Sequence, residues 1–220
     1  MKQIWRDLLF AHWPMPVSAL RPLVPAGLAL DTFDGHAWLT IAPFHMEIRP
    51  RGLPPLPGLR HIPELNCRTY VTLDGKPGVF FLSLDITSRM AVWTARTFYH
   101  LPYFHAEMGI KRSGETISYF SRRGSAAWRS TYSAASVARH ASHSVDHFLT
   151  ERYCLYAVHG GRVYRGDIHH LPWPLQHAHA EIQENTIAQA AGIPLQGPPA
   201  IVSFTRELEV LVWWPQAIAG

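Results

Sequence analysis

The chain is poor in charge and in cysteine, and both shortages restrict what it can be. Charged residues make up 16% of its 220 residues, against about 25% in an average protein, whereas aromatic residues reach 12%. A large core or a partner subunit must therefore cover much of the surface, and we expect a homo-oligomer. The two cysteines, Cys67 and Cys154, are too few for the disulfide framework of a secreted protein. A reduced, cytoplasmic protein is expected.

Long hydrophobic runs and basic clusters are missing as well. Arg6 and Asp7 interrupt the N-terminal segment where a signal peptide needs an unbroken apolar core, and no apolar run of 18 residues follows. The sequence therefore predicts neither a Sec-type signal nor a membrane span. The net charge of +4 comes from scattered arginines and not from a basic stripe that follows a phosphate backbone. Nucleic acid is not an expected partner.

Familiar catalytic signatures are also absent. The chain has no Gly-x-Gly-x-x-Gly, Gly-x-x-x-x-Gly-Lys-Ser/Thr, Cys-x-x-Cys, Gly-x-Ser-x-Gly or His-Glu-x-x-His. Nucleotide cofactors and standard hydrolase chemistry lose most of their support. The 14 histidines include His140, His143 and His147, with Asp146 nearby, and a second cluster at 169–179, but a His-rich composition gives such spacings by chance. We expect no metal and no cofactor.

What the chain does have is a series of apolar, β-branched runs separated by turn residues. Strands are predicted at 36–48, 64–71, 78–85, 116–122, 153–158, 163–168 and 201–214. Short helices are predicted at 16–25, 91–99 and 145–152, and a proline-rich loop at 50–63. The sequence thus predicts one mainly β (α+β) domain over residues 1–220. Its sheet is expected to be antiparallel, and closed or nearly closed.

The segment 64–71 carries the most informative pattern. As a strand it places Glu64, Asn66, Arg68 and Tyr70 on one face, and Leu65, Cys67, Thr69 and Val71 on the other. An acid, an amide, a base and a phenol on one face are more typical of a pocket wall than of a solvated edge. The alternative is an exposed antiparallel strand whose outward residues happen to be varied.

The next predicted strand, 78–85, adds one more polar candidate. Strict alternation places Val79, Phe81, Ser83 and Asp85 on one face, opposite a purely apolar one. Such a strand is expected to be buried on both faces. Its Ser83 is therefore a candidate to supply a hydrogen bond within a pocket.

Five separate blocks of the sequence together resemble one bacterial family. They are ELNCRTYV at 64–71, GVFFLSLD at 78–85, ARTFYHLPYF at 95–104, ERYCLY at 151–156 and HHLPWPLQ at 169–176. In this order they resemble the YqjF-like family, a domain family of unassigned function, over nearly the whole chain. That family is in turn similar in fold to acetoacetate decarboxylase. The resemblance implies an antiparallel, double-walled β-barrel or sandwich with a few short helices around a small apolar cavity.

The resemblance also implies a departure from decarboxylase chemistry. The decarboxylase segment reads Gly-Arg-Glu, three residues, an aromatic and Pro-Lys-Lys, and its first lysine forms a Schiff base with the keto acid. In this register Arg96 matches the arginine and Pro102 the proline, while Tyr103 and Phe104 replace both lysines. Glu64 corresponds, more weakly, to the cavity glutamate. We therefore expect a chain that keeps the cavity and drops Schiff-base decarboxylation.

No other lysine is a natural substitute for the missing pair. The chain has only Lys2, Lys76 and Lys111, at the terminus, in the Asp74–Pro77 turn and in a predicted hairpin. All three are expected to face solvent.

The leading hypothesis is a protein that binds, or acts on, a small carbonyl or carboxylate compound. Arg68 or Arg96 would bind the anion, and Glu64 or Tyr103 would exchange a proton in lyase- or hydrolase-like acid–base chemistry. Further hydrogen bonds are expected from Asn66, Tyr70, Ser83 and Tyr103. Glu64 and Arg68 share a strand face, and we expect them to be close enough for an ion pair.

Other interpretations remain open at this point. The protein is alternatively a non-catalytic ligand-binding or sensor module, or a structural interaction protein in which Glu64 and Arg68 only pair with each other. Arg96 alternatively braces its own helix, and Tyr103 alternatively fills the volume of a former lysine.

Overall fold

The computed structural model describes residues 1–49, 60–137, 139–140 and 145–218. The strands are β1 Lys2–Met15, β2 Ala29–Leu30, β3 Ala37–Arg49, β4 Ile62–Leu73, β5 Lys76–Ile86, β6 Tyr103–His105, β7 Glu107–Ser113, β8 Thr116–Arg123, β9 Ala126–Ala134, β10 Arg139–His140, β11 Cys154–His159, β12 Arg162–His170, β13 Pro174–Asn185, β14 Ile201–Val212 and β15 Gln216–Ala217. The helices are α1 Val17–Leu20, η1 Arg21–Leu23, α2 Arg89–Thr94, η2 Ala95–Tyr99, α3 Val145–Thr150 and α4 Ile187–Ala190. The predicted mainly β fold is confirmed.

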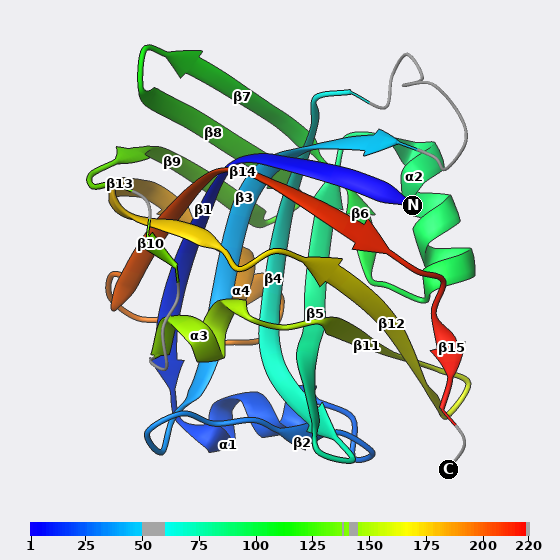
Figure 1. Ribbon diagram of the computed structural model, residues 1–220. Coiled ribbons are helices and arrows are strands. Elements are labelled where there is room, and N and C mark those ends of the chain that lie inside the picture. Colours follow the sequence, from blue (N-terminus) through cyan, green and yellow to red (C-terminus); the bar gives the residue numbers. More distant parts are fainter. Residues whose placement is uncertain (50–59, 138, 141–144, 219–220) are drawn as a thin grey trace.

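Hydrogen bonding joins the strands into one sheet that folds back on itself. Its order is β15-β12-β11-β5-β4-β3-β1-β14-β13-β9-β8-β7, and an additional pairing of β12 with β14 closes a ring. The strands β7, β8, β9 and β13 continue beyond the ring as a second layer, which lies beside β1 and β3 in Figure 1. The two walls agree with the double-walled arrangement predicted from the resemblance. The sheet is not wholly antiparallel, because β5 pairs in parallel with β6 and with β11.

The inner and outer faces of the ring pack in two separate hydrophobic cores. Leu8, Phe10, Phe44 and Leu84 belong to the cluster inside the ring. Their chain neighbours, such as Leu9 and Ala11, instead join Trp128 and other residues in the cluster between the ring and the second layer. Alternation along β1 thus supplies both cores from one strand. Because both sides are buried, the strand is apolar nearly throughout.

Strand β4 follows the face pattern that the sequence predicts. Leu65 and Cys67 pack in the outer core, whereas Glu64, Asn66 and Arg68 face the inside of the ring and are at most 6% exposed. The alternative of an exposed antiparallel strand with varied outward residues is therefore wrong. β4 lies between β3 and β5 in the middle of the sheet, and its polar face is turned away from solvent.

Strand β5 departs from the predicted alternation because of a β-bulge. Cys67 pairs with Ser83 while Arg68 pairs with Phe81, so Leu82 is an extra residue on β5. The bulge reverses the faces beyond it. Val79, Phe81, Leu84 and Ile86 face the inside of the ring. Ser83 shares the face of Cys67, and the prediction that it lies inside with Glu64 is wrong.

Asp85 confirms the reversed face. Its carboxylate accepts hydrogen bonds from Ser121 Oγ at 2.9 Å and from Arg123 Nε at 2.5 Å, and both partners belong to β8 of the second layer. The bulge therefore leaves β5 with an apolar inner face and places its polar residues between the two walls.

The remaining sequence expectations have mixed outcomes. Cys67 and Cys154 are buried and free. Most of the predicted proline-rich loop, 50–59, and His143 of the first histidine cluster lie outside the described residues. Within the described ranges, no three His, Cys, Asp or Glu side chains gather in a metal-binding arrangement. None of the helices found there has the length and apolarity that crossing a membrane requires.

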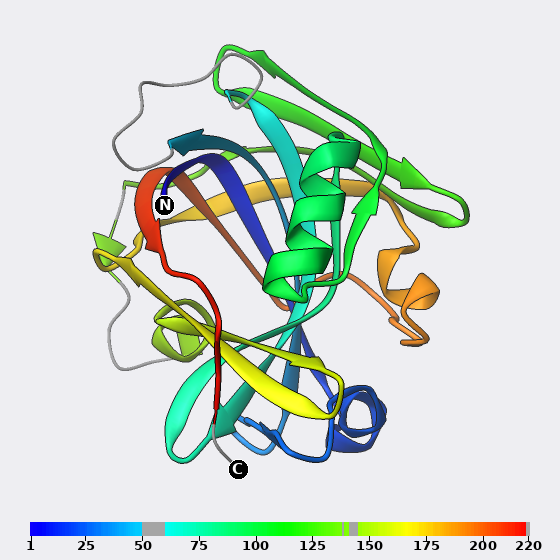
Figure 2. The same cartoon turned by 90° about the vertical axis from the view of Figure 1, so that its right-hand side faces the viewer.

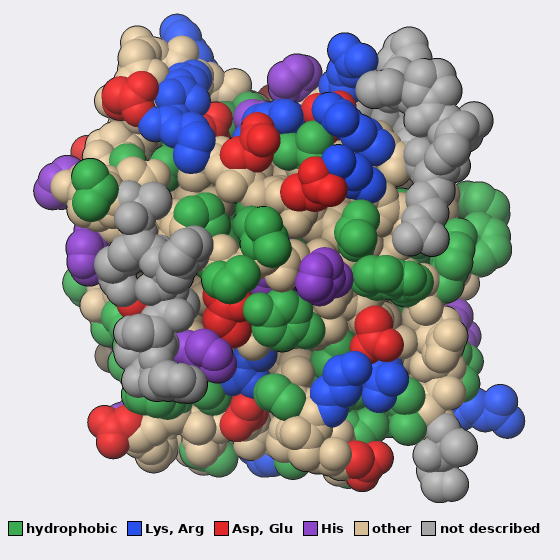
Figure 3. All heavy atoms as spheres, viewed as in Figure 1, with side chains coloured by type: hydrophobic (Ala, Val, Ile, Leu, Met, Phe, Trp, Pro, Cys, Tyr) green, Lys and Arg blue, Asp and Glu red, His purple; other side chains and the backbone are tan. Residues whose placement is uncertain are grey.

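Charged side chains of both signs lie next to one another on the face seen in Figure 3. Among the ion pairs of the protein, Arg6 contacts both Glu47 at 3.0 Å and Glu207 at 2.7 Å, and Arg49 contacts Glu47 at 2.7 Å. The adjoining acids neutralise these arginines locally.

Candidate functional site

A cavity of about 290 Å³ opens inside the ring. Its walls come from β1, β3, β4 and β5, from α2 and η2, and from residues near the ends of α3, β12 and β14. Figure 2 shows α2 and η2 in front of the strands, across from the N-terminal part of β1. Most lining side chains are apolar, which makes the few polar ones informative.

The polar side chains of β4 form a line along one wall. Glu64, Asn66 and Arg68 all line the cavity. They stand at alternate positions, so the Cα atoms of Glu64 and Arg68 are about 13 Å apart along an extended strand. Asn66 lies between them, and its Oδ1 atom is buried without a hydrogen-bond partner.

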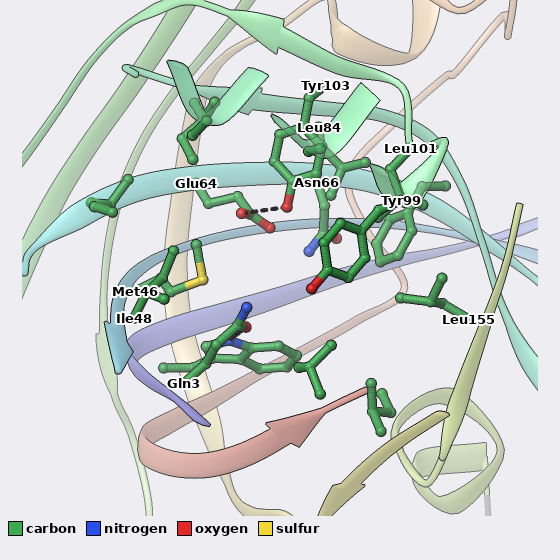
Figure 4. A pocket seen from close by; sticks show the side chains of 18 of the residues that line it. Gln3, Met46, Ile48, Glu64, Asn66, Leu84, Tyr99, Leu101, Tyr103 and Leu155 are labelled. Atoms are coloured by element: carbon green, nitrogen blue, oxygen red, sulfur yellow. Dashed lines mark hydrogen bonds between the residues drawn. The ribbon is translucent and has the colours of Figure 1, made fainter. Parts of the chain in front are cut away.

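Glu64 is paired with Tyr103. The Tyr103 hydroxyl donates a hydrogen bond of 2.9 Å to Glu64 Oε2, which Figure 4 shows at the cavity wall. Burial raises the pKa of Glu64 to about 7, although the bond from Tyr103 acts in the opposite direction. Burial, together with the neighbouring Glu64, raises the pKa of Tyr103 well above its usual value. Near neutral pH the carboxyl group of Glu64 therefore loses its proton easily, whereas the hydroxyl of Tyr103 keeps its proton.

The segment before β6 places Tyr103 in this position. Residues Ala95–Tyr99 form a π-helical turn, and His100 then adopts a left-handed conformation with φ of 56°. This turn directs the chain back along β5, where Tyr103 pairs with Leu84. Single π-helical turns are rare and are frequent at functional sites.

The same turn brings in Tyr99, which sequence reasoning missed. The Tyr99 ring is 8% exposed, lines the cavity and stacks on Trp214 with 4.8 Å between ring centroids. Its hydroxyl points into the cavity in Figure 4. Burial raises its pKa. The block ARTFYHLPYF contains Tyr99, but nothing in the sequence separates it from the other aromatic residues of that block.

Arg68 has no acidic partner among the described residues. The predicted ion pair with Glu64 is wrong, because Asn66 separates the two residues along the strand and Glu64 bonds to Tyr103 instead. The Arg68 guanidinium is instead 5.1 Å from the ring centroid of Phe10 and 5.9 Å from that of Tyr70. Its Nε atom is buried and has no hydrogen-bond partner.

His12 does not compensate the charge of Arg68. It is 1% exposed, and burial, with Arg68 nearby, lowers its pKa well below the usual value. Its imidazole is therefore neutral at neutral pH. Arg68 is thus a buried cation in a cavity wall, flanked by aromatic rings and a neutral histidine.

Tyr70 lies behind the cavity wall and not in it. It is fully buried, and its hydroxyl is 2.6 Å from Thr40 Oγ1, which is in turn 2.8 Å from His12 Nδ1. The phenol oxygen is thus engaged in the core, while the Tyr70 ring packs under Arg68. The prediction that Tyr70 contacts the ligand is replaced by a supporting position for Arg68.

Arg96 does not reach the cavity. It is exposed on η2, where its Nε donates a hydrogen bond of 2.6 Å to the Tyr103 carbonyl and its guanidinium lies over Phe104. The prediction that Arg96 binds the ligand anion is therefore wrong, and the alternative that it braces its segment holds. By holding the Tyr103 carbonyl, Arg96 fixes the backbone that positions the Tyr103 ring.

A second arginine lines the same cavity. Arg152, 4% exposed, lines the cavity and lies 5.1 Å from the Tyr70 ring centroid. Unlike Arg68, it is neutralised by Asp31, whose Oδ2 is 2.6 Å from Nη1. The sequence predicts Arg152 only as the last residue of a helix over 145–152, and nothing local reveals the contact with Asp31, 121 residues away.

His170 and Trp173 complete this end of the cavity. Trp173 packs edge-to-face on Phe10 with 4.9 Å between ring centroids, and its buried Nε1 has no hydrogen-bond partner. The two His170 ring nitrogens face backbone carbonyls, those of Leu171 at 2.9 Å and Arg152 at 3.4 Å. The indole N–H of Trp173 and the Nε–H of Arg68 are therefore buried donors without a partner, and both residues line the cavity.

The three lysines are elsewhere. Lys2 pairs with Glu209 at 2.6 Å, Lys76 pairs with Asp167 at 2.7 Å, and Lys111 is exposed on β7. None of them lines the cavity. All three positions fall within the described ranges, and their predicted surface locations are confirmed.

Comparison with known proteins gives the family and the fold. The family model described as an uncharacterized conserved protein, DUF2071, matches residues 2–209. The uncharacterized protein YqjF of Bacillus subtilis is 48% identical over 218 residues, which cover 97% of this chain and 90% of that protein.

Solved structures with the same fold are far more distant in sequence. The enduracididine biosynthesis enzyme MppR, complexed with pyruvate, matches with a TM-score of 0.69 at 9% identity, over 99% of this chain and 90% of that one. Acetoacetate decarboxylase from Legionella pneumophila matches with a TM-score of 0.65 at 10% identity, over 99% and 87%. These likenesses confirm the predicted acetoacetate decarboxylase-like fold and carry no activity with them. The chain belongs to the uncharacterized DUF2071 family and, as its sequence blocks indicate, is YqjF-like.

Proposed function

We propose that this protein binds, and acts on, a small carboxylate or carbonyl compound in the cavity inside the ring. One observation carries the proposal: the buried guanidinium of Arg68 lines the cavity and has no acidic partner among the described residues. Burial of an uncompensated charge is unfavourable by several kcal/mol. The carboxylate of a ligand compensates that charge and accepts the hydrogen bonds that the guanidinium now lacks.

The Glu64–Tyr103 pair is suited to proton transfer on such a ligand. A carboxyl group with a pKa of about 7 is present in both protonation states at neutral pH. That is the range in which a general acid or base works best. Tyr103 keeps its own proton and orients the carboxyl group through the 2.9 Å hydrogen bond. Glu64 is therefore the proposed acid–base residue, and Tyr103 is proposed to position it.

Schiff-base chemistry is not part of the proposal. An imine requires a lysine amine at the reacting carbon, and none of the three lysines lines the cavity. The structural neighbours support a carbonyl acid as the ligand class, since MppR has been observed with pyruvate and the decarboxylases are named for acetoacetate. We infer that this chain shares the ligand class and handles it by acid–base chemistry.

Calorimetric titration with pyruvate, acetoacetate and propanoate tests binding. Binding to the wild type should weaken at least tenfold in Arg68→Met. The matched control Arg162→Met removes an exposed arginine from the β11–β12 hairpin and should change nothing. Equal affinity in wild type and Arg68→Met would contradict the proposal.

Borohydride reduction in the presence of acetoacetate tests the chemistry. An imine would be trapped as a stable adduct, which mass spectrometry detects; we expect no mass increase. Proton exchange at the carbon next to the carbonyl, followed by NMR in heavy water, should depend on Glu64. Binding without exchange or turnover would favour a sensor, the non-catalytic alternative.

A further inference from the structure

The cavity is large for a three-carbon acid. An apolar cavity of about 150 Å³ holds a benzene molecule, which has six heavy atoms. The cavity in this protein measures about 290 Å³, which corresponds to roughly a dozen heavy atoms on the same scale. Pyruvate, also with six heavy atoms, would leave about half of the space empty.

Water is a poor filler for the remaining space. Polar side chains outside β4 also line the cavity, among them Gln3, Thr94 and Arg152, but much of the wall is aliphatic. The aliphatic lining includes Met46, Ile62, Leu84, Ile86 and Leu155. Water is retained in a cavity where it finds two to four polar partners, and apolar cavities stay dry or bind apolar ligands. These walls therefore favour the hydrocarbon part of a ligand.

The cavity is also directional. At one end, Arg68 packs against Phe10 and Tyr70, which are fully buried. At another, Met90 of α2 lines the cavity and is 71% exposed as a residue. A ligand whose carboxylate lies at Arg68 thus extends its apolar part past Asn66 and Glu64 toward α2.

We propose that the ligand is a monocarboxylate with an apolar body of about eight carbons, of the medium-chain or arylalkyl class. The inference rests on the proposed function, because it takes Arg68 as the carboxylate-binding residue. It narrows the ligand class from any small carboxylate to one whose hydrocarbon part fills the cavity. The proton-sharing pair Glu64–Tyr103 then faces the middle of the ligand and not its carboxylate.

A chain-length series measured by calorimetry tests the inference. Each buried methylene should tighten binding about fourfold. Octanoate should therefore bind at least a hundredfold more tightly than propanoate, with 3-phenylpropanoate in between or near octanoate. Octanamide, which lacks the charge, should bind at least tenfold more weakly than octanoate.

Replacing either of two alanines by phenylalanine tests where the hydrocarbon part of the ligand lies. Ala91 lines the cavity from α2 and is partly buried, so Ala91→Phe fills part of the space without removing a core residue. This variant should bind octanoate at least tenfold more weakly, and its affinity for propanoate should change less than twofold. Ala190→Phe places the same side chain at an exposed position of α4 and should leave both affinities unchanged. Thermal unfolding confirms that both variants fold.

The outcomes separate the two proposals. Propanoate binding as tightly as octanoate, with both weakened in Arg68→Met, would overturn the size class and leave the proposed function intact. Octanoate and octanamide binding equally, with no effect of Arg68→Met, would overturn the proposed function. Unchanged octanoate affinity in Ala91→Phe would overturn the placement of the hydrocarbon part toward α2.

Discussion

Tyr103 and Glu64 are separated by 39 positions in the chain and are joined by a hydrogen bond of 2.9 Å inside the ring. The bond exists because β6, which carries Tyr103, pairs in parallel with β5, the neighbour of the Glu64 strand β4. The register predicted from the sequence places this tyrosine where the decarboxylase family has its Schiff-base lysine. The phenol at this position donates its hydrogen bond to a buried carboxyl group.

The raised pKa of Glu64 makes stability depend on pH. The pKa is about 7 in the folded protein and 4.5 in the reference state, so the folded state binds the extra proton between these values. Stability contributed by Glu64 should therefore fall as the pH rises from about 4.5 to 7, by on the order of 3 kcal/mol. Glu64→Gln should remove this component. Urea unfolding at pH 5 and pH 8 measures it as the difference between the two proteins.

A surface substitution provides the control for that measurement. Glu181→Gln changes an exposed glutamate of β13 and should retain the pH dependence of the wild type. If the free energy of unfolding changed with pH equally in the wild type and in Glu64→Gln, Glu64 would not titrate in this range.

Removing the Tyr103 hydroxyl should raise the pKa of Glu64 further. The hydrogen bond from Tyr103 favours the ionised carboxylate, so its loss in Tyr103→Phe should raise the pKa of Glu64 above about 7. The ionised carboxylate then lacks its donor, and the variant should lose about 1–3 kcal/mol at pH 8 and less at pH 5. NMR titration of labelled glutamate reports the pKa directly. An unchanged or lower pKa would contradict the assigned role of the bond.

The two cavity arginines should respond in opposite ways to the same substitution. Arg68 is buried without an acidic partner, so Arg68→Met removes an uncompensated charge and should leave the unliganded protein as stable or more stable. Arg152→Met leaves Asp31 without its partner, and Asp31 is only partly exposed. A loss of about 1–3 kcal/mol is expected there. Chemical unfolding compares the two, and a large loss in Arg68→Met would indicate a structural role.

Ser83 and Asn66 test the position of the β5 bulge. Ser83 lies outside the ring with Cys67, so Ser83→Ala should change ligand affinity less than twofold. Asn66 lines the cavity with an unpartnered carbonyl oxygen, and Asn66→Leu should change octanoate affinity by several-fold or more. Calorimetry with octanoate distinguishes them, and an effect of Ser83→Ala equal to that of Asn66→Leu would place the bulge elsewhere.

The closure of the ring between β5 and β11 depends on Gly78. A Cβ atom at this position would be 2.8 Å from the Cys154 carbonyl oxygen, a backbone atom that cannot move away easily. Gly78→Ala should therefore destabilise the fold by about 1–3 kcal/mol. Gly27→Ala is the control, since its Cβ would make an ordinary 3.5 Å contact with Val163. Similar melting temperatures for both variants would contradict the close approach.

The sequence could predict what alternation along a single strand determines. The two faces of β4 follow from the two-residue period, and Glu64, Asn66 and Arg68 therefore lie where the pattern places them. The same rule fails for Ser83, because a bulge adds one residue to β5 and reverses the faces beyond it. No feature of the segment 78–85 predicts the bulge, because the bulge is defined by the pairing of β5 with β4 across the sheet.

The prediction that Arg96 lines the cavity fails for a related reason. The decarboxylase register aligns residues along the chain, but a π-helical turn changes the rotation per residue, so α-helical spacing no longer tells which side of the helix faces the cavity. Arg96 lies outward and Tyr99 inward as a result. Arg152 and Trp173 were missed because they reach the cavity only after distant strands have closed the ring.

The polar line of the cavity stands on one strand, whereas part of the apolar wall comes from a short helical segment. Glu64, Asn66 and Arg68 all stand on β4, in the middle of a hydrogen-bonded sheet, while Ala91, Ala95 and Tyr99 come from a short helical segment at one side. Substitutions in that helical segment can reshape the space for a hydrocarbon body without moving the strand that carries charge and proton. Under the proposed function, related proteins can therefore differ in the ligands they accept while the residues proposed to bind the carboxylate and transfer the proton keep their positions.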